Sequence, residues 1–129
     1  MVRIAGIQIA PIFLDAQKTW EKLSRYIREA KLKGAELVTW GETLIPGYPQ
    51  WVWISPSEKY KFRDPHQKSI YSKYWEECIK LDESNIIEEM KVLAKDLDLM
   101  MMGGIAEKYG GSIYCTLLTI NQEGEILGR

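Results

Sequence analysis

The sequence lacks an excess of charge of either sign, and it lacks any long apolar run. Among its 129 residues, 17 Lys and Arg nearly balance 18 Asp and Glu, for a formal net charge of -1. Surfaces that bind nucleic acid or acidic membranes carry clustered basic residues, so we expect neither partner. No stretch approaches the roughly 20 apolar residues of a membrane-spanning helix, so we expect no membrane span.

The chain is also poor in the residues that hold metals and cofactors. It has two cysteines, Cys78 and Cys115, which lie far apart without a C-x-x-C partner, and one histidine, His66. This pattern predicts no metal site and no disulfide framework, and it is typical of a reducing, cytoplasmic setting. The Gly103–Gly104 and Gly110–Gly111 pairs do not match a phosphate-binding loop. We interpret them as turn glycines and expect no cofactor.

Both cysteines are expected to have packing roles. Cys115 alternates with Tyr114 and Thr116 in an apolar segment, which favours a small buried hydrophobe. Cys78 lies on a predicted helix, where Lys80 points to a different face, so no cation is expected to stabilise its thiolate.

The N-terminal segment predicts a strand, a helix and a second strand. Residues 2–10 form the first strand and residues 35–40 the second, more continuous one. Asp15 is the expected N-cap of the helix, and Gly34 stands at the C-cap position. One apolar helical face is formed by Ala16, Trp20, Leu23, Ile27 and Ala30.

The remainder predicts further helices and strands in alternation. We expect a long aromatic-rich loop, a helix over residues 65–81, and a helix over 85–97 that begins with an Asn85–Glu88 capping box and buries Ile86, Met90, Leu93 and Leu97. Strands are expected over residues 99–107, 112–120 and 125–129, with a turn over 121–124. This order predicts an α/β fold in which helices cover a sheet.

The strongest candidate for chemistry is Glu42, in the stretch ELVTWGETLIPGYPQWVW at residues 36–53. It follows the expected end of an apolar strand, where α/β folds display catalytic groups. Pro46 and Gly47 fit the central positions of a type II turn. A stiff loop of this kind would hold Glu42 as a general base, and its aromatic neighbours would exclude water. The alternative is a loop glutamate that caps backbone amides.

The segment WGETLIPGYPQWVW resembles the first catalytic motif of the nitrilase superfamily of carbon–nitrogen hydrolases. The segments VRIAGIQIAP and MMMGGIAEKYGGSIYCTLLTINQEGEILGR resemble other parts of the same family. The resemblance implies a four-layer αββα sandwich, of which residues 1–129 are the N-terminal part of a single domain. Among the branches of the family, the Pro-Gly-Tyr-Pro loop looks most like the nitrilases proper.

In this family a glutamate acts as general base, a cysteine attacks the nitrile or amide carbon, and a lysine stabilises the developing charge. The resemblance assigns Glu42 as the glutamate, and Tyr48 and Trp51 as substrate-binding residues. Gly41 stands where the family commonly has proline. The family's lysine and cysteine motifs follow the part that this chain matches, so neither Cys78 nor Cys115 is assigned as the nucleophile.

Three hypotheses for function remain after the sequence analysis. The first is hydrolysis of a nitrile, or less favourably an amide, to a carboxylic acid and ammonia, with no metal or cofactor. The second is a non-catalytic truncated chain or a subunit that associates with another polypeptide. The third is a small-molecule binding module that uses the aromatic loop. Because half a sandwich would expose strand edges and a sheet face, we expect a homo-oligomer or a complementing chain.

Overall fold

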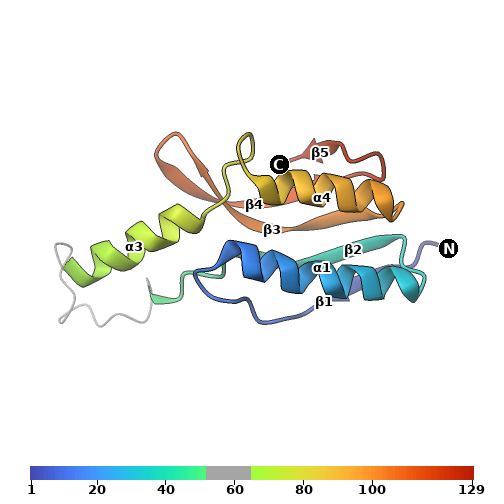
Figure 1. The fold of residues 1–129 in the computed structure, drawn as a ribbon, viewed down its shortest axis with the longest axis horizontal. Coiled ribbons are helices and arrows are strands. Elements are labelled where there is room, and N and C mark those ends of the chain that lie inside the picture. Colours follow the sequence, from blue (N-terminus) through green and yellow to red (C-terminus); the bar gives the residue numbers. More distant parts are fainter. Residues whose placement is uncertain (52–64) are drawn as a thin grey trace.

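The computed structural model describes residues 1–51 and 65–129. Its described residues form one sheet of five strands in the order β1-β2-β3-β4-β5 (Figure 1). The strands are β1 (Ile4–Ile7), β2 (Leu37–Ile45), β3 (Met100–Tyr109), β4 (Ser112–Ile120) and β5 (Ile126–Gly128). The first three strands are parallel, and β3, β4 and β5 pair antiparallel. The predicted α/β class is confirmed.

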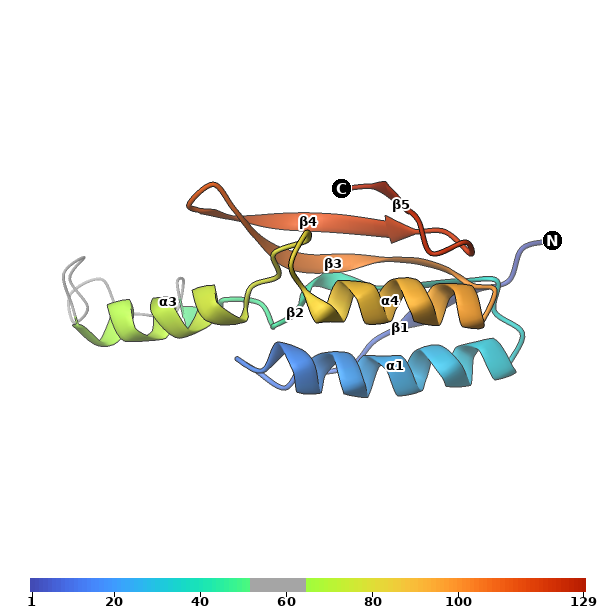
Figure 2. The same cartoon turned by 45° about the horizontal axis from the view of Figure 1, so that its top comes forward.

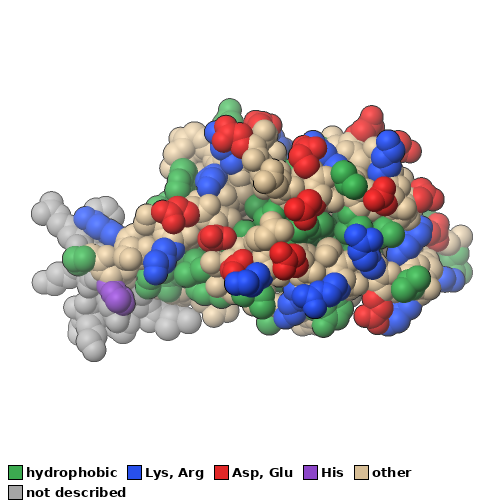
Figure 3. Space-filling view, in the orientation of Figure 1, with side chains coloured by type: hydrophobic (Ala, Val, Ile, Leu, Met, Phe, Trp, Pro, Cys, Tyr) green, Lys and Arg blue, Asp and Glu red, His purple; other side chains and the backbone are tan. Residues whose placement is uncertain are grey.

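Three helices accompany the sheet: α1 (Ala16–Leu32), α3 (Pro65–Glu77) and α4 (Asn85–Asp96). Helices α1 and α4 lie side by side on one face of the sheet, and α3 extends beyond its end (Figures 1 and 2). The face that carries α1 and α4 shows both signs of charge interspersed (Figure 3), in agreement with the balanced composition.

Local signals in the sequence explain why α1 begins and ends where it does. The Asp15 side chain accepts a hydrogen bond from the Lys18 amide at 2.9 Å, which satisfies one of the free N–H groups of the first turn. The predicted apolar stripe is buried along its whole length. Gly34 follows the C-cap residue with φ +86°, the left-handed conformation that glycine adopts without cost. All three predictions for this helix are confirmed.

The capping box predicted for α4 is wrong. Ser84 has the extended backbone of an N-cap, so Asn85 is already the first helical residue and Glu88 stands one position too far along to complete the box. The buried stripe consists of Ile86, Ile87, Met90, Leu93 and Ala94, whereas Leu97 is partly buried. The helix expected over residues 65–81 ends at Glu77.

The core lies between the helices and the sheet. Leu23 and Ile27 of α1, Met90 of α4, and Val38 and Met101 of the sheet are fully buried there. Burial of each such side chain contributes about 1.5–3 kcal/mol relative to exposure. The core therefore fixes α1 and α4 on this face of the sheet.

The opposite face of the sheet is open within the described residues, where no helix lies over it. Ile4 and Leu117 are 62% and 56% exposed on this face, and Gly6, Thr39 and Met102 lie in register across it. The chain therefore shows one helical layer and one sheet layer, which is the first half of the four-layer arrangement that the sequence predicts.

Two glycines predicted to form a turn lie inside β3 instead. Gly103 and Gly104 belong to this strand, whereas Gly110 and Gly111 do form the turn between β3 and β4, with positive φ angles. A Cβ atom on Gly103 would lie 2.0–2.3 Å from three atoms of the Trp40 indole. The position is glycine because the Trp40 ring packs directly on the backbone there.

We expect Gly103→Ala to destabilise the chain by about 1–3 kcal/mol, because the added methyl group overlaps the Trp40 ring and forces it out of its packed position. Urea denaturation, monitored by tryptophan fluorescence, measures the change. Gly6→Ala is the matched control, because a Cβ atom there meets nothing within 4 Å. Equal stability of the two variants would contradict this account of Gly103.

Candidate active site

Strand β2 does not end at Trp40 as predicted but continues, with a large bulge, to Ile45. Trp40 pairs with Gly103 and Ile45 with Ile105, so residues 41–44 of β2 lie opposite Gly104 alone. Glu42 is in this bulge. Bulges re-aim side chains and are frequent beside active sites. The bulge also explains why β1 ends early at Ile7, since its pairing stops at Trp40.

The bulge can form only because the residue opposite it has no side chain. A Cβ atom on Gly104 would lie 2.5 Å from the Glu42 Cα, 2.6 Å from the Thr43 nitrogen and 2.7 Å from the Gly41 oxygen. Real Cβ atoms do not approach backbone atoms this closely. Gly104 therefore sets where the backbone of Glu42 lies.

Thr43, next to Glu42, is held in an unfavourable state. Its φ angle is +45°, which is rare for a β-branched residue and costs about 1–3 kcal/mol. The side chain is buried, and its Oγ1 has no hydrogen-bond partner among the described residues. Backbone strain of this kind occurs most often at functional sites.

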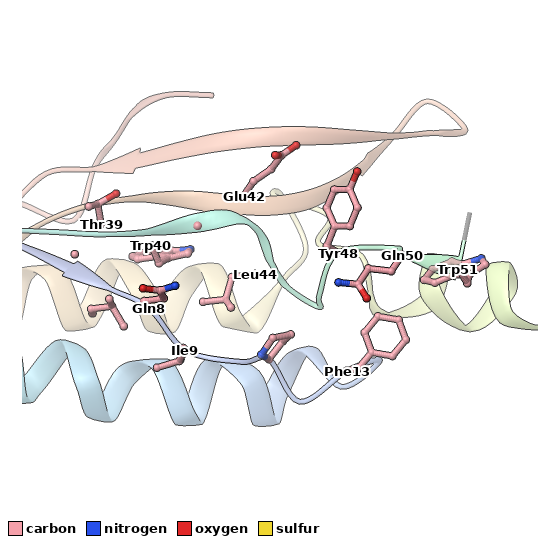
Figure 4. A pocket seen from close by; sticks show the side chains of 14 residues that line it. Gln8, Ile9, Phe13, Thr39, Trp40, Glu42, Leu44, Tyr48, Gln50 and Trp51 are labelled. Atoms are coloured by element: carbon pink, nitrogen blue, oxygen red, sulfur yellow. The ribbon is translucent and has the colours of Figure 1, made fainter. Parts of the chain in front are cut away.

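The carboxylate of Glu42 is exposed in this chain, contrary to the expectation that aromatic neighbours exclude water from it. Its side chain points from the bulge towards β4, on the same side as the Tyr48 ring (Figure 4). Glu42 forms a side-chain hydrogen bond with Cys115 of β4. A glutamate capping the amides of its own loop is therefore not the arrangement observed.

The two cysteines differ in environment. Cys78 is buried as predicted, and burial raises the pKa of its thiol to about 12, with the nearby Lys108 acting in the opposite direction. Cys115 is exposed, so the prediction of a buried residue is wrong. The reason is that Cys115 faces the open side of the sheet. Partial desolvation raises the pKa of its thiol, as do the hydrogen bond to Glu42 and that residue's charge.

The loop after the bulge is fixed by contacts with other elements rather than by a type II turn. The Ile45–Pro46 peptide bond is cis, and Gly47 has φ +120°. The Gly47 amide donates to the Thr43 oxygen at 3.1 Å, which spans five residues, and the Tyr74 hydroxyl of α3 donates to the Gly47 oxygen at 3.0 Å. The predicted turn type is wrong, although the predicted positive φ at Gly47 is confirmed.

The three residues that the sequence singled out line one open pocket of about 1010 Å³. Glu42 and Tyr48 lie on its β4 side, and Trp51 lies near its far end beside Phe13 (Figure 4). Its other lining residues are Gly6, Ile7, Gln8, Ile9, Pro11, Thr39, Trp40, Gly41, Leu44 and Gln50. The pocket therefore lies where β1 and β2 end, with an apolar lining and a few polar groups, as small-molecule sites commonly have.

Trp51 has a packing role as well as a place in the pocket. Its ring makes edge-to-face contacts with Phe13 at 5.8 Å and with Tyr74 at 4.9 Å between centroids. Tyr48 is 40% exposed, so its ring is available to the pocket. The rest of the aromatic loop that the sequence analysis noted, residues 52–64, lies outside the described residues.

Within residues 1–51 and 65–129, no group of three or more His, Cys, Asp or Glu side chains could hold a metal ion. In the same ranges, no helix is long and apolar enough to cross a membrane.

Sequence reasoning missed three residues of the site. Gly104 was read as a turn residue, although a glycine between apolar strand residues also signals a close backbone approach. Cys115 was assigned to the core. Tyr74 lay in an aromatic-rich segment and carried no signal for its hydrogen bond to a loop so distant in sequence.

Comparison with known proteins places the chain in a family. The profile of the carbon-nitrogen hydrolase family matches residues 3–129, and the chain belongs to this family. An aliphatic nitrilase of Rhodococcus rhodochrous is 33% identical over 128 residues, which is 98% of this chain and 33% of the relative. An arylacetonitrilase of Aspergillus niger is 30% identical over 128 residues, which is 99% of this chain and 35% of the relative. The resemblance to the nitrilase superfamily is confirmed.

Solved structures share the fold at low sequence identity. A mutant amidase of Nesterenkonia sp. AN1 in complex with butyramide is 17% identical with a TM-score of 0.62, over 98% of this chain and 41% of that one. A carbon-nitrogen hydrolase from Helicobacter pylori G27 is 16% identical with a TM-score of 0.63, over 98% of this chain and 38% of that one. The chain spans about a third of the length of the curated relatives it matches.

We expect Tyr74→Phe to destabilise the chain by about 1–3 kcal/mol, because it leaves the buried Gly47 oxygen without its hydrogen-bond donor. Urea denaturation measures the loss. Tyr71→Phe is the matched control on the same helix, since the Tyr71 side chain is half exposed. A Tyr74→Phe variant as stable as Tyr71→Phe would show that α3 does not fix the loop.

Proposed function

We propose that residues 1–129 form the N-terminal part of a single carbon–nitrogen hydrolase domain that converts a nitrile to a carboxylic acid and ammonia. The observation that carries the proposal is Glu42, a carboxylate presented by a strand bulge at an apolar pocket in a chain of this family. Glu42 is the general base, and Tyr48 and Trp51 contact the substrate. The chemistry requires no metal and no cofactor.

In the proposed reaction Glu42 accepts the proton of a cysteine thiol, and the sulfur attacks the nitrile carbon. A C–S bond forms while one bond of the C≡N group becomes an N–H bond, and a lysine stabilises the charge. Water then adds, ammonia leaves, and hydrolysis of the thioester releases the acid. The cysteine and the lysine come from outside residues 1–129, either from a continuation of the domain or from a complementing chain.

Nitriles are favoured over amides as the substrate class. The relatives that are at least 30% identical are an aliphatic nitrilase and arylacetonitrilases. The amidase of Nesterenkonia sp. AN1 shares the fold at lower identity, and acrylamide adds to its active-site cysteine. That amidase supports a thiol nucleophile in this fold, and it keeps amides as the second candidate substrate.

We further propose a cytoplasmic setting, because both cysteines are free thiols.

The test is a chimaera that joins residues 1–129 to the remaining C-terminal part of the Rhodococcus rhodochrous aliphatic nitrilase. We expect it to release ammonia from aliphatic nitriles. Glu42→Gln should lower kcat at least about 100-fold, because an amide cannot accept the thiol proton. Residues 1–129 alone should release no ammonia. Glu123→Gln is the matched control, since it removes the same charge from an exposed turn remote from the pocket.

A folded chimaera that keeps its activity as Glu42→Gln would remove Glu42 from the mechanism. Turnover by residues 1–129 alone that disappears in Cys78→Ala or Cys115→Ala would overturn the assignment of the nucleophile to another segment.

We also expect residues 1–129 on their own to self-associate or to bind a complementing chain. The open face of the sheet carries exposed apolar side chains such as Ile4 and Leu117, and exposed patches of this kind drive pairing between chains. Light scattering across a dilution series measures the association. The double variant Ile4→Lys/Leu117→Lys should shift the equilibrium towards monomer, whereas Val92→Lys, on the exposed side of α4, should not. A monodisperse wild-type monomer would contradict this expectation.

A further inference from the structure

We propose that Cys115 is a positioning residue for Glu42: its thiol donates a hydrogen bond to the carboxylate and holds it in the orientation that proton transfer requires. The role as a positioning residue rests on the function proposed above. The contact between the two side chains does not, because it is a property of residues 1–129 alone.

The geometry begins with the backbone of the bulge. Gly104 pairs with Leu117, and Ala106 pairs with Cys115, so Leu117 and Cys115 lie on the same face of β4, two residues apart. The missing Cβ atom of Gly104 points at the Glu42 Cα. The bulge therefore folds across β3 on the open face of the sheet, beside Leu117 and Cys115.

The side chain of Glu42 completes the approach. It extends from the bulge towards β4 (Figure 4), where it meets the Cys115 thiol in a hydrogen bond. Three strands thus contribute one element each. Strand β2 supplies the carboxylate, β3 supplies a glycine over which it crosses, and β4 supplies the donor.

The direction of the hydrogen bond follows from the two groups. An ionised carboxylate only accepts, and it has two oxygens with about four lone-pair sites. The thiol must therefore donate. One oxygen is then tied to Cys115, and the other stays available for the proton of a nucleophile, so the hydrogen bond restricts rotation of the carboxylate without blocking its function.

The same contact makes Cys115 a poor nucleophile. Thiols react as thiolates, and a negative carboxylate at hydrogen-bond distance disfavours a second negative charge. The other ionisable groups that act on this pair electrostatically are Tyr48 and Tyr74, through Tyr74. Neither is a cation that would stabilise a thiolate.

The contact is tested on residues 1–129 by alkylation with iodoacetamide across a pH series, followed by peptide mass mapping, at concentrations below the onset of self-association. Removing the carboxylate charge should lower the pKa of the Cys115 thiol. We therefore expect Glu42→Gln to alkylate Cys115 about threefold faster, or more, near pH 8.5, with the midpoint of the pH profile at lower pH. Glu123→Gln should leave both unchanged.

Cys78 reports on folding in the same samples, because it is buried and should resist alkylation in every folded variant. The infrared S–H stretching band gives a second measurement of the hydrogen bond. We expect a lowered band, absent in Cys115→Ala, that moves to higher frequency in Glu42→Leu. An unchanged pH profile and an unchanged band would overturn the contact.

The positioning role is tested in the chimaera by Cys115→Ala and Cys115→Ser. Loss of the donor should lower kcat about 10-fold with KM unchanged, because a misoriented base affects proton transfer rather than binding. The serine hydroxyl also donates, so Cys115→Ser should recover most of kcat. Full kcat in Cys115→Ala, or no recovery in Cys115→Ser, would overturn the positioning role. An inactive chimaera would count against the proposed function and would leave the alkylation result valid.

Discussion

The close approach of the β2 bulge to Gly104 is the constraint on which the site depends. Four residues of β2 lie opposite this one residue of β3, and the Glu42 backbone occupies the space that a side chain would fill. The bulge turns a strand residue into a presented carboxylate, and it ends the pairing of β1 at Ile7. The pocket opens where that pairing stops. A single missing Cβ atom therefore links the sheet topology to the placement of Glu42.

A second set of contacts holds the loop that follows the bulge. Tyr74 of α3 reaches the Gly47 oxygen, and its ring packs on Trp51, which in turn packs on Phe13. These residues come from three separate parts of the sequence. Because proton transfer requires hydrogen-bond reach, a base on a mobile loop would be ineffective. The aromatic contacts allow the bulge, with its strained Thr43, to persist.

The sequence predicted what local signals determine and missed what distant residues determine. Helix α1 was predicted correctly because its N-cap Asp15, its apolar stripe and Gly34 all agree. The bulge could not be predicted from β2, because its cause is Gly104 on another strand. Cys115 was placed in the core because alternation along a strand does not reveal which face of the sheet is covered. The motif around Glu42 identified the candidate residue, but not its exposure or its contact with Cys115.

The exposure of Glu42 and the openness of the sheet are the same feature. The bulge crosses β3 on the face that α1 and α4 leave uncovered, beside the exposed side chains of Leu117 and Cys115. Any layer that covered this face would also remove water from the carboxylate. Desolvation strengthens electrostatic interactions, so the hydrogen bond from Cys115 would then matter more than it does in an exposed pair. The surface through which this half of the fold associates is thus also the surface on which its base is presented.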